Sequence, residues 1–141
     1  MAFAISPSGA CASDWSVDCE GDACVVAQSA AAEDRTWLAT VLIEPLDEGA
    51  AQAQLFVPAG VHLASGLFVG VKDRPLRTEF IDCDAMSCRA SLQLNRADLT
   101  GWKKAREAEV RYRPSLGGPV ISFPLSLMGL TAALRSLEGP K

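Results

Sequence analysis

Residues 15–30 of the chain read WSVDCEGDACVVAQSA, and residues 76–94 read LRTEFIDCDAMSCRASLQL. In each stretch two cysteines are separated by four polar or small residues, and short apolar or alternating runs lie on both sides. That pattern is typical of a β-hairpin with one cysteine at the end of each strand. The two stretches therefore predict two hairpins in a sheet protein.

The spacing of Cys19 and Cys24, repeated in Cys83 and Cys88, favours a disulfide within each hairpin. Across so short a loop the Cα atoms can come within the roughly 4.4–6.8 Å that a disulfide requires. Such a closure stabilises the fold by roughly 2 kcal/mol, against about 4 kcal/mol for a Cys19–Cys83 link. Local pairing is therefore favoured by the geometry of the short loop and not by the size of the stabilisation. Long-range pairing and four reduced thiols stay open, and zinc is disfavoured because His62 is far from both pairs in the sequence. Disulfides would place the protein in an oxidising compartment, which in a bacterium is the periplasm or the exterior.

The composition indicates one globular domain with little catalytic equipment. The chain has 141 residues, of which 49% are hydrophobic and 21% charged, and these values exclude disorder and coiled coil. The net charge of −4 argues against nucleic-acid binding, and a single histidine limits acid–base and zinc chemistry. Residues 1–71 hold one basic and nine acidic side chains, whereas residues 72–141 hold twelve basic and eight acidic ones.

The rest of the chain predicts further short strands and two helices. Strands are expected over 36–44, 54–57, 67–71, 109–113 and 120–125, and residues 76–82 and 88–94 are expected to form the second hairpin. The strand at 36–44 is expected to be central, with Trp37 on the same face as Val41 and Ile43, and the three tryptophans are expected in the core. A short helix over 96–105 is capped by Asn95, and an amphipathic C-terminal helix is capped by Ser126. About eight strands with two helices predict a mostly β (α+β) single domain, an antiparallel β-sandwich or barrel.

The domain is expected to span residues 14–141, after a flexible N-terminal segment, 1–13, that is a signal remnant or an added start. Residues 1–10 lack the basic residues and the long apolar run of a complete signal peptide. Cys11 is expected to be an odd thiol able to form an intermolecular disulfide, with lipidation as the alternative. No apolar run approaches the roughly 18 residues that span a bilayer.

One surface feature stands out as a candidate binding patch. It comprises the cations of the first helix end and the next strand: Lys103, Lys104, Arg106, Arg111 and Arg113. Such a patch is either a solvated face or a contact for anionic lipid, lipopolysaccharide or an acidic partner. Asp82 and Asp84 suit a solvated hairpin loop better than a calcium loop, and His62 is expected to be exposed or partly packed. The sequence predicts no catalytic, cofactor-binding or metal-binding residues.

Four elements together resemble the invasion-associated locus B family. They are the run from Asp14 to Cys19 with Cys24, the element Val57-Pro58-Ala59-Gly60-Val61-His62-Leu63 with Gly66, the pair Cys83 and Cys88, and Pro124-Leu125-Ser126-Leu127-Met128-Gly129-Leu130 with Ala133-Leu134. The resemblance implies a small exported protein of alphaproteobacteria, found in the periplasm or with the outer membrane, in a family named for a member linked to red-cell invasion. It implies no enzymatic activity and no cofactor, and transfers only structural residues: Trp15, the four cysteines, Pro58, Gly60 and Gly129. Cys11 departs from the family pattern.

We therefore expect an exported, disulfide-stabilised, non-enzymatic binding protein whose partner is a host-cell or envelope component. The alternative is a periplasmic enzyme or folding factor that uses carboxylates.

Overall fold

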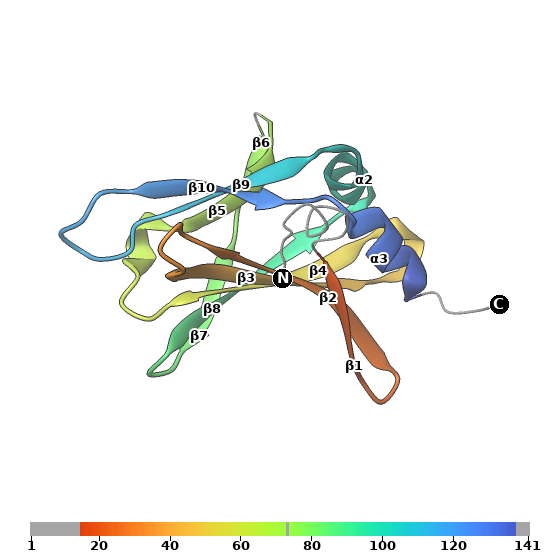
Figure 1. Ribbon diagram of the computed structural model, residues 1–141, viewed down its shortest axis with the longest axis horizontal. Helices are drawn as coiled ribbons and strands as arrows, with labels where there is room; N and C mark the ends of the chain where they lie inside the picture. The colour runs from red at the N-terminus through yellow and green to blue at the C-terminus, as the bar shows by residue number, and fades with distance from the viewer. Residues whose placement is uncertain (1–14, 73, 138–141) are drawn as a thin grey trace, which may run out of the picture.

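The structure is a computed structural model, and it describes residues 15–72 and 74–137. This part of the chain forms two antiparallel sheets, one of six strands in the order β1-β2-β3-β4-β8-β7 and one of four in the order β10-β9-β5-β6 (Figure 1). The strands are β1 Ser16–Glu20, β2 Ala23–Ala31, β3 Trp37–Pro45, β4 Ala51–Pro58, β5 Leu67–Val71, β6 Arg74–Arg77, β7 Glu79–Cys83, β8 Ser87–Leu94, β9 Glu107–Tyr112 and β10 Ile121–Ser126. The helices are α2 Arg96–Lys104 and α3 Leu130–Ser136, with short 3₁₀ turns η2 Asp47–Gly49 and η3 Leu63–Ser65.

The two sheets face each other across one hydrophobic core, so the predicted mostly β sandwich is confirmed, with ten strands instead of about eight. Every second residue of β4 is buried, and β3, β8 and β9 alternate in the same way. This period of two places one face of each strand in the core and the other outside. Tyr112 of β9 ties the layers together, because its hydroxyl donates a hydrogen bond of 2.7 Å to the carbonyl oxygen of Leu38 in β3.

Both helices lie at one end of the sandwich, on the right in Figure 1. Leu99 and Trp102 of α2 and Leu130 and Leu134 of α3 are buried in the common core. Since these side chains recur on one face of each helix, the opposite faces and the helix ends are left for polar residues. The end of the molecule that carries the helices is therefore where the charged surface described below forms.

The predicted hairpin disulfides are confirmed. Cys19 lies opposite Cys24 in the pairing of β1 with β2, and their Cα atoms are 4.1 Å apart. Cys83 and Cys88 pair in the same way across β7 and β8, with Cα atoms 3.9 Å apart. Cys88 is buried, whereas Cys83 and Cys19 are exposed, so each disulfide lies at the outer end of a hairpin.

The prediction of one continuous strand over 76–82 was wrong. The chain leaves the four-stranded sheet at Arg77 and enters the six-stranded sheet at Glu79. Thr78, between them, is buried, and its backbone N–H and its hydroxyl both donate to the carbonyl oxygen of Leu67, each at 2.9 Å. These two hydrogen bonds fix the point at which the chain crosses from one sheet to the other.

The predicted position of Trp37 was also wrong. The register of β2 and β3 pairs Ala30 with Ala39 and Ala31 with Trp37, so a bulge skips Leu38. The bulge turns the Trp37 indole away from the core, and the indole N–H donates to the Thr40 hydroxyl at 2.8 Å. Trp15 and Trp102 are buried, as predicted.

The C-terminal helix begins later than predicted. Gly129, with φ of 89°, is its N-cap, and Ser126 is the last residue of β10, where its hydroxyl accepts from the N–H of Met128 at 3.1 Å. Asn95 caps α2 as predicted, accepting from the N–H of Asp98. The expectations for the segment 1–13, and for Cys11 within it, lie outside the described residues.

Candidate functional site

A basic surface covers the end of the sandwich where α2, β9 and α3 meet. Three of its cations belong to the predicted patch and two come from elsewhere in the sequence; together they are Lys72, Lys103, Lys104, Arg106 and Arg135. All five side chains are exposed, and none forms an ion pair with another described residue. We refer to these five residues as the basic surface.

Two adjoining hollows lie in the basic surface. A hollow of about 420 Å³ is lined by Lys103, Lys104, Arg106 and Arg135, with Met128 among the apolar residues of its wall. A second hollow of about 470 Å³ shares Lys104 and Arg106 with the first and adds Lys72 together with two carboxylates, Glu107 and Glu109. The five cations therefore outnumber the acids that line the two hollows.

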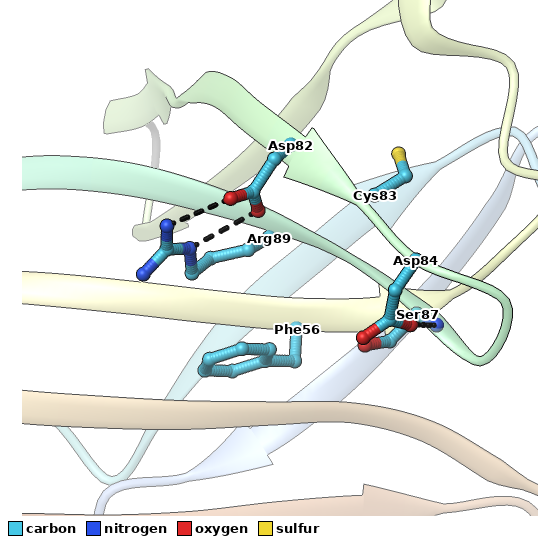
Figure 2. A pocket seen from close by; sticks show the side chains of 6 residues that line it. All are labelled: Phe56, Asp82, Cys83, Asp84, Ser87 and Arg89. Atoms are coloured by element: carbon cyan, nitrogen blue, oxygen red, sulfur yellow. Dashed lines mark hydrogen bonds and ion pairs between the residues drawn. The ribbon is translucent and has the colours of Figure 1, made fainter.

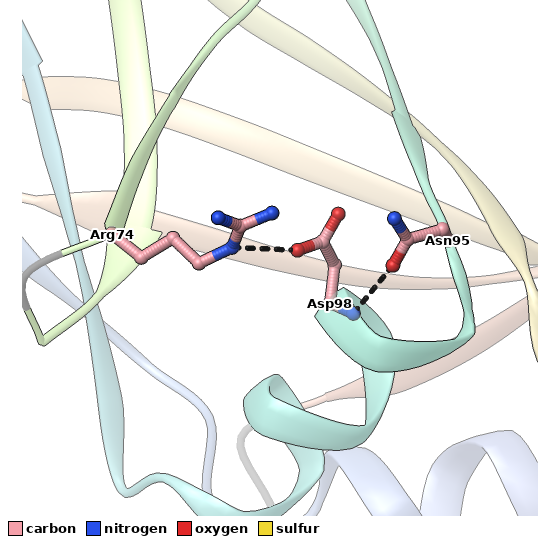
Figure 3. Close-up of polar contacts among 3 residues, drawn as sticks. All are labelled: Arg74, Asn95 and Asp98. Atoms are coloured by element: carbon pink, nitrogen blue, oxygen red, sulfur yellow. Dashed lines mark hydrogen bonds and ion pairs between the residues drawn. The ribbon is translucent and has the colours of Figure 1, made fainter.

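The orientation of α2 is fixed at its first turn, as Figure 3 shows. The side chain of Asn95 accepts from the N–H of Asp98 at 2.8 Å, and the Asp98 carboxylate pairs with Nε of Arg74 in β6 at 3.0 Å. The Asp98 side chain is only 8% exposed, whereas that of Arg74 is 66% exposed, so the carboxylate is held in place while the guanidinium covers it from the solvent side. With Leu99 and Trp102 in the core, the last turn then presents Lys103 and Lys104 to solvent.

The segment after α2 is held against the one that leads into α3. The N–H of Leu127 donates to the carbonyl oxygen of Arg106 at 2.8 Å, and the Thr131 hydroxyl donates to that of Lys103 at 3.4 Å. These two hydrogen bonds bring Arg135 to the side of the cations of α2 and β9, although about thirty residues separate them in sequence. The basic surface is built on anchored elements.

The structure separates the other two residues of the predicted patch from the basic surface. Arg111 lies further along β9, on the outer face of the four-stranded sheet, with its guanidinium carbon 5.0 Å from the centre of the Phe68 ring. Arg113 lies past the end of β9 and donates to the Ser65 hydroxyl at 3.2 Å and to the carbonyl oxygen of Gly118 at 2.9 Å. Neither residue lines the two hollows.

Sequence reasoning missed Lys72 and Arg135. Lys72 follows β5 and Arg135 lies in the last turn of α3. Arg135 had a local signal, because it falls next to the leucine stripe of an amphipathic helix and so must face solvent. Nothing in the sequence near Lys72 indicates that the turn after β5 comes beside α2.

His62 takes part in a loop contact on the other side of the fold. Its Nδ1 lies 2.6 Å from the Ser65 hydroxyl, which also accepts from Arg113. The N–H of His62 donates to the carbonyl oxygen of Arg113 at 2.9 Å. These bonds tie the loop after β4 to the loop after β9, and His62 is partly buried, as the sequence indicates.

A separate hollow of about 300 Å³ lies beside the second disulfide (Figure 2). Asp82 is engaged by Arg89 through two bonds of 3.2 and 2.9 Å, and the ring of Phe56 lines the same hollow. Asp84 accepts from the N–H groups of Ser87 and Met86 and so closes the hairpin loop. Within 15–72 and 74–137, no three side chains of the His, Cys, Asp and Glu type gather as a metal site would require.

The carboxyls with a shifted pKa are held in the ionised form. Hydrogen bonds from the backbone of Ser87, and then of Met86, lower the pKa of Asp84. A backbone bond from Thr36 lowers the pKa of Asp34 in the same way. A general acid at neutral pH needs the opposite shift.

Two stacked antiparallel sheets, the larger of which has a disulfide-closed hairpin at each of its two edges, define a small disulfide-stabilised β-sandwich with a basic end. The chain belongs to the family described as invasion associated locus B (IalB) protein, which matches residues 12–138. The fold agrees with the crystal structure of invasion associated protein B from Bartonella henselae, at a TM-score of 0.78 and 15% identity over 89% of this chain and 92% of that one. No curated protein matches the chain. None of the helices within the described residues is long and apolar enough to cross a membrane.

Proposed function

We propose that this protein is an exported, non-enzymatic binding protein of the bacterial envelope, and that the basic surface is its contact site. The observation that carries the proposal is the group of five exposed cations, none paired with a described acid, around two adjoining hollows. In a chain of net charge −4, such a concentration of positive charge selects an anionic partner. Anionic lipid, lipopolysaccharide and acidic envelope proteins share that chemistry.

The two disulfides support the location. Disulfides of this kind persist in the periplasm and outside the cell, and are reduced in the cytosol. Membership of a family named for invasion supports a location in the envelope or at the host-facing surface, and the Bartonella henselae protein is likewise named as invasion associated. The lowered pKa values of Asp34 and Asp84 fit a structural use of carboxylates better than acid catalysis.

The location is tested by thiol trapping in cells that express the full natural gene. Rapid acid quenching, followed by alkylation of free thiols, should find Cys19, Cys24, Cys83 and Cys88 unmodified, and cell fractionation should find the protein in the envelope or the medium. Alkylated cysteines and a cytosolic protein would overturn the proposed location.

The contact site is tested with a charge-matched pair of variants. Lys104→Gln/Arg106→Gln removes two charges that both hollows share, whereas Arg35→Gln/Arg96→Gln removes two exposed charges that line neither hollow. Sedimentation with isolated envelope fragments should fall for the first variant alone. Equal sedimentation of both variants would contradict a role for the basic surface.

A further inference from the structure

The basic surface carries an apolar side chain among its cations. Met128 lies between β10 and α3 and lines the hollow that holds Lys103, Lys104 and Arg106. Met128 is 44% exposed, whereas its neighbour Leu127 is 3% exposed and belongs to the core. The thioether therefore projects from the same face that presents the cations.

Met128 is held in this position by the turn that precedes α3. Its N–H donates to the Ser126 hydroxyl at 3.1 Å, and Gly129 follows it with φ of 89°, a conformation that glycine adopts without strain. The next residue, Leu130, is fully buried. The exposed methionine thus lies in a turn whose two flanking residues are anchored in the core.

Cations ringed around a projecting apolar side chain match the interface of an anionic bilayer. Lys and Arg side chains pair with lipid phosphates there, while an apolar side chain enters the boundary between headgroups and acyl chains. An acidic protein surface would satisfy the cations but would cover Met128 only if it also carried a matching apolar site, whereas every bilayer has an apolar layer directly beneath its headgroups. The charge of the whole chain is −4, so an anionic bilayer attracts this face and repels much of the rest.

We infer that the basic surface docks the protein onto an anionic phospholipid bilayer, with its five cations against lipid phosphates and Met128 inserted among the headgroups. The inference rests on the proposed function, because it names the partner of the same surface. It requires Lys103, Lys104 and Arg106 to reach one plane together with Arg135, which their place around a single hollow allows.

Co-sedimentation with vesicles tests the docking. The full chain is mixed with phosphatidylcholine vesicles alone or with added phosphatidylglycerol, at low and at physiological salt. Each cation near an anionic surface contributes a factor of about five in partitioning, so Lys104→Gln/Arg106→Gln should lower binding about 25-fold. Arg35→Gln/Arg96→Gln, with the same net charge, should change it less than about twofold.

A second pair of variants tests insertion. Met128→Ser should lower binding to phosphatidylglycerol vesicles about fivefold, because it removes apolar area that the headgroup layer covers. Met86→Ser alters a methionine that is 78% exposed on the distant β7–β8 hairpin, and should leave binding unchanged. Both residues are exposed, so neither variant is expected to unfold the protein.

Three results would overturn the inference. The first is equal binding to neutral and anionic vesicles, and the second is no binding to either. The third is displacement of the protein from vesicles by inorganic phosphate at matched ionic strength, which would show that the surface binds free phosphate. If the Lys104→Gln/Arg106→Gln variant no longer binds envelope fragments, while neither this variant nor the wild type binds vesicles, the proposed function stands and the lipid partner is wrong. If envelope fragments do not distinguish the two charge variants, the proposed function itself fails.

Discussion

Tyr112 gives the sharpest test of how the two sheets are joined. Tyr112 is 2% exposed, and its hydroxyl donates to the carbonyl oxygen of Leu38, which the β2–β3 register skips. Burial raises the pKa of Tyr112 from 10.0 to about 12. The phenolate is therefore disfavoured in the folded protein.

The sign of the pH dependence follows from that shift. The unfolded chain releases the phenolic proton near pH 10, whereas the folded chain keeps it until about pH 12. The stabilisation is complete below pH 10 and is lost as the pH rises towards 12, by about 3 kcal/mol of unfolding free energy in all. Tyr112→Phe removes this dependence and costs about 1–2 kcal/mol at neutral pH, because the Leu38 carbonyl loses its donor.

The assay is simple because the chain has one tyrosine. Ultraviolet absorbance of the phenolate, followed against pH, reports Tyr112 alone, and the same titration in concentrated guanidinium supplies the unfolded reference. Unfolding curves of the wild type and of Tyr112→Phe at neutral and alkaline pH supply the free energies. A folded-state midpoint near pH 10, or equal alkaline losses of stability in both proteins, would refute the reasoning.

Three further predictions concern the strands and hairpins. Gly70→Ala should destabilise the fold by about 3 kcal/mol or more in thermal melts, since a Cβ there would collide with the Arg74 carbonyl oxygen and lie 2.7 Å from Cα of Pro75. The control is Gly117→Ala, where a Cβ would have nothing within 4 Å, and its stability should stay within about 0.5 kcal/mol of the wild type. Replacing Cys19 and Cys24 with alanine should cost about 2 kcal/mol in guanidinium unfolding, the entropy of a short closed loop, and a neutral result would show that this disulfide does not constrain the unfolded chain. Asp84→Asn should lower the melting temperature near neutral pH, and its difference from the wild type should shrink as the pH falls below about 3.9, because the lowered pKa of Asp84 adds stability that is lost as the folded-state carboxylate is protonated; a difference that does not change with pH would contradict this.

The sequence predicted those features that depend on local spacing. The two cysteine pairs, the strand at 109–113 and the Asn95 cap each involve residues a few positions apart, and the structure confirms all three. Family resemblance added the overall class, which the match over residues 12–138 confirms.

Long-range geometry explains what the sequence did not predict. The break at Thr78 interrupts a run that continues as strand on both sides, and only the bonds to Leu67 reveal it. The bulge at Leu38 turns Trp37 outward without any glycine or proline to mark it. In the same way Lys72 joins the basic surface only because β5 ends beside α2.

The most direct test of the central claim is a salt titration of binding to isolated envelope fragments. Because the contact depends on charge, the bound fraction of the wild-type protein should fall steeply as ionic strength rises from about 0.01 M to 0.15 M, over which the Debye length shrinks from about 30 Å to 8 Å. Lys104→Gln/Arg106→Gln should bind weakly throughout with a shallower slope, and Arg35→Gln/Arg96→Gln should follow the wild type. Three superimposed curves would contradict the account of the basic surface as the contact site.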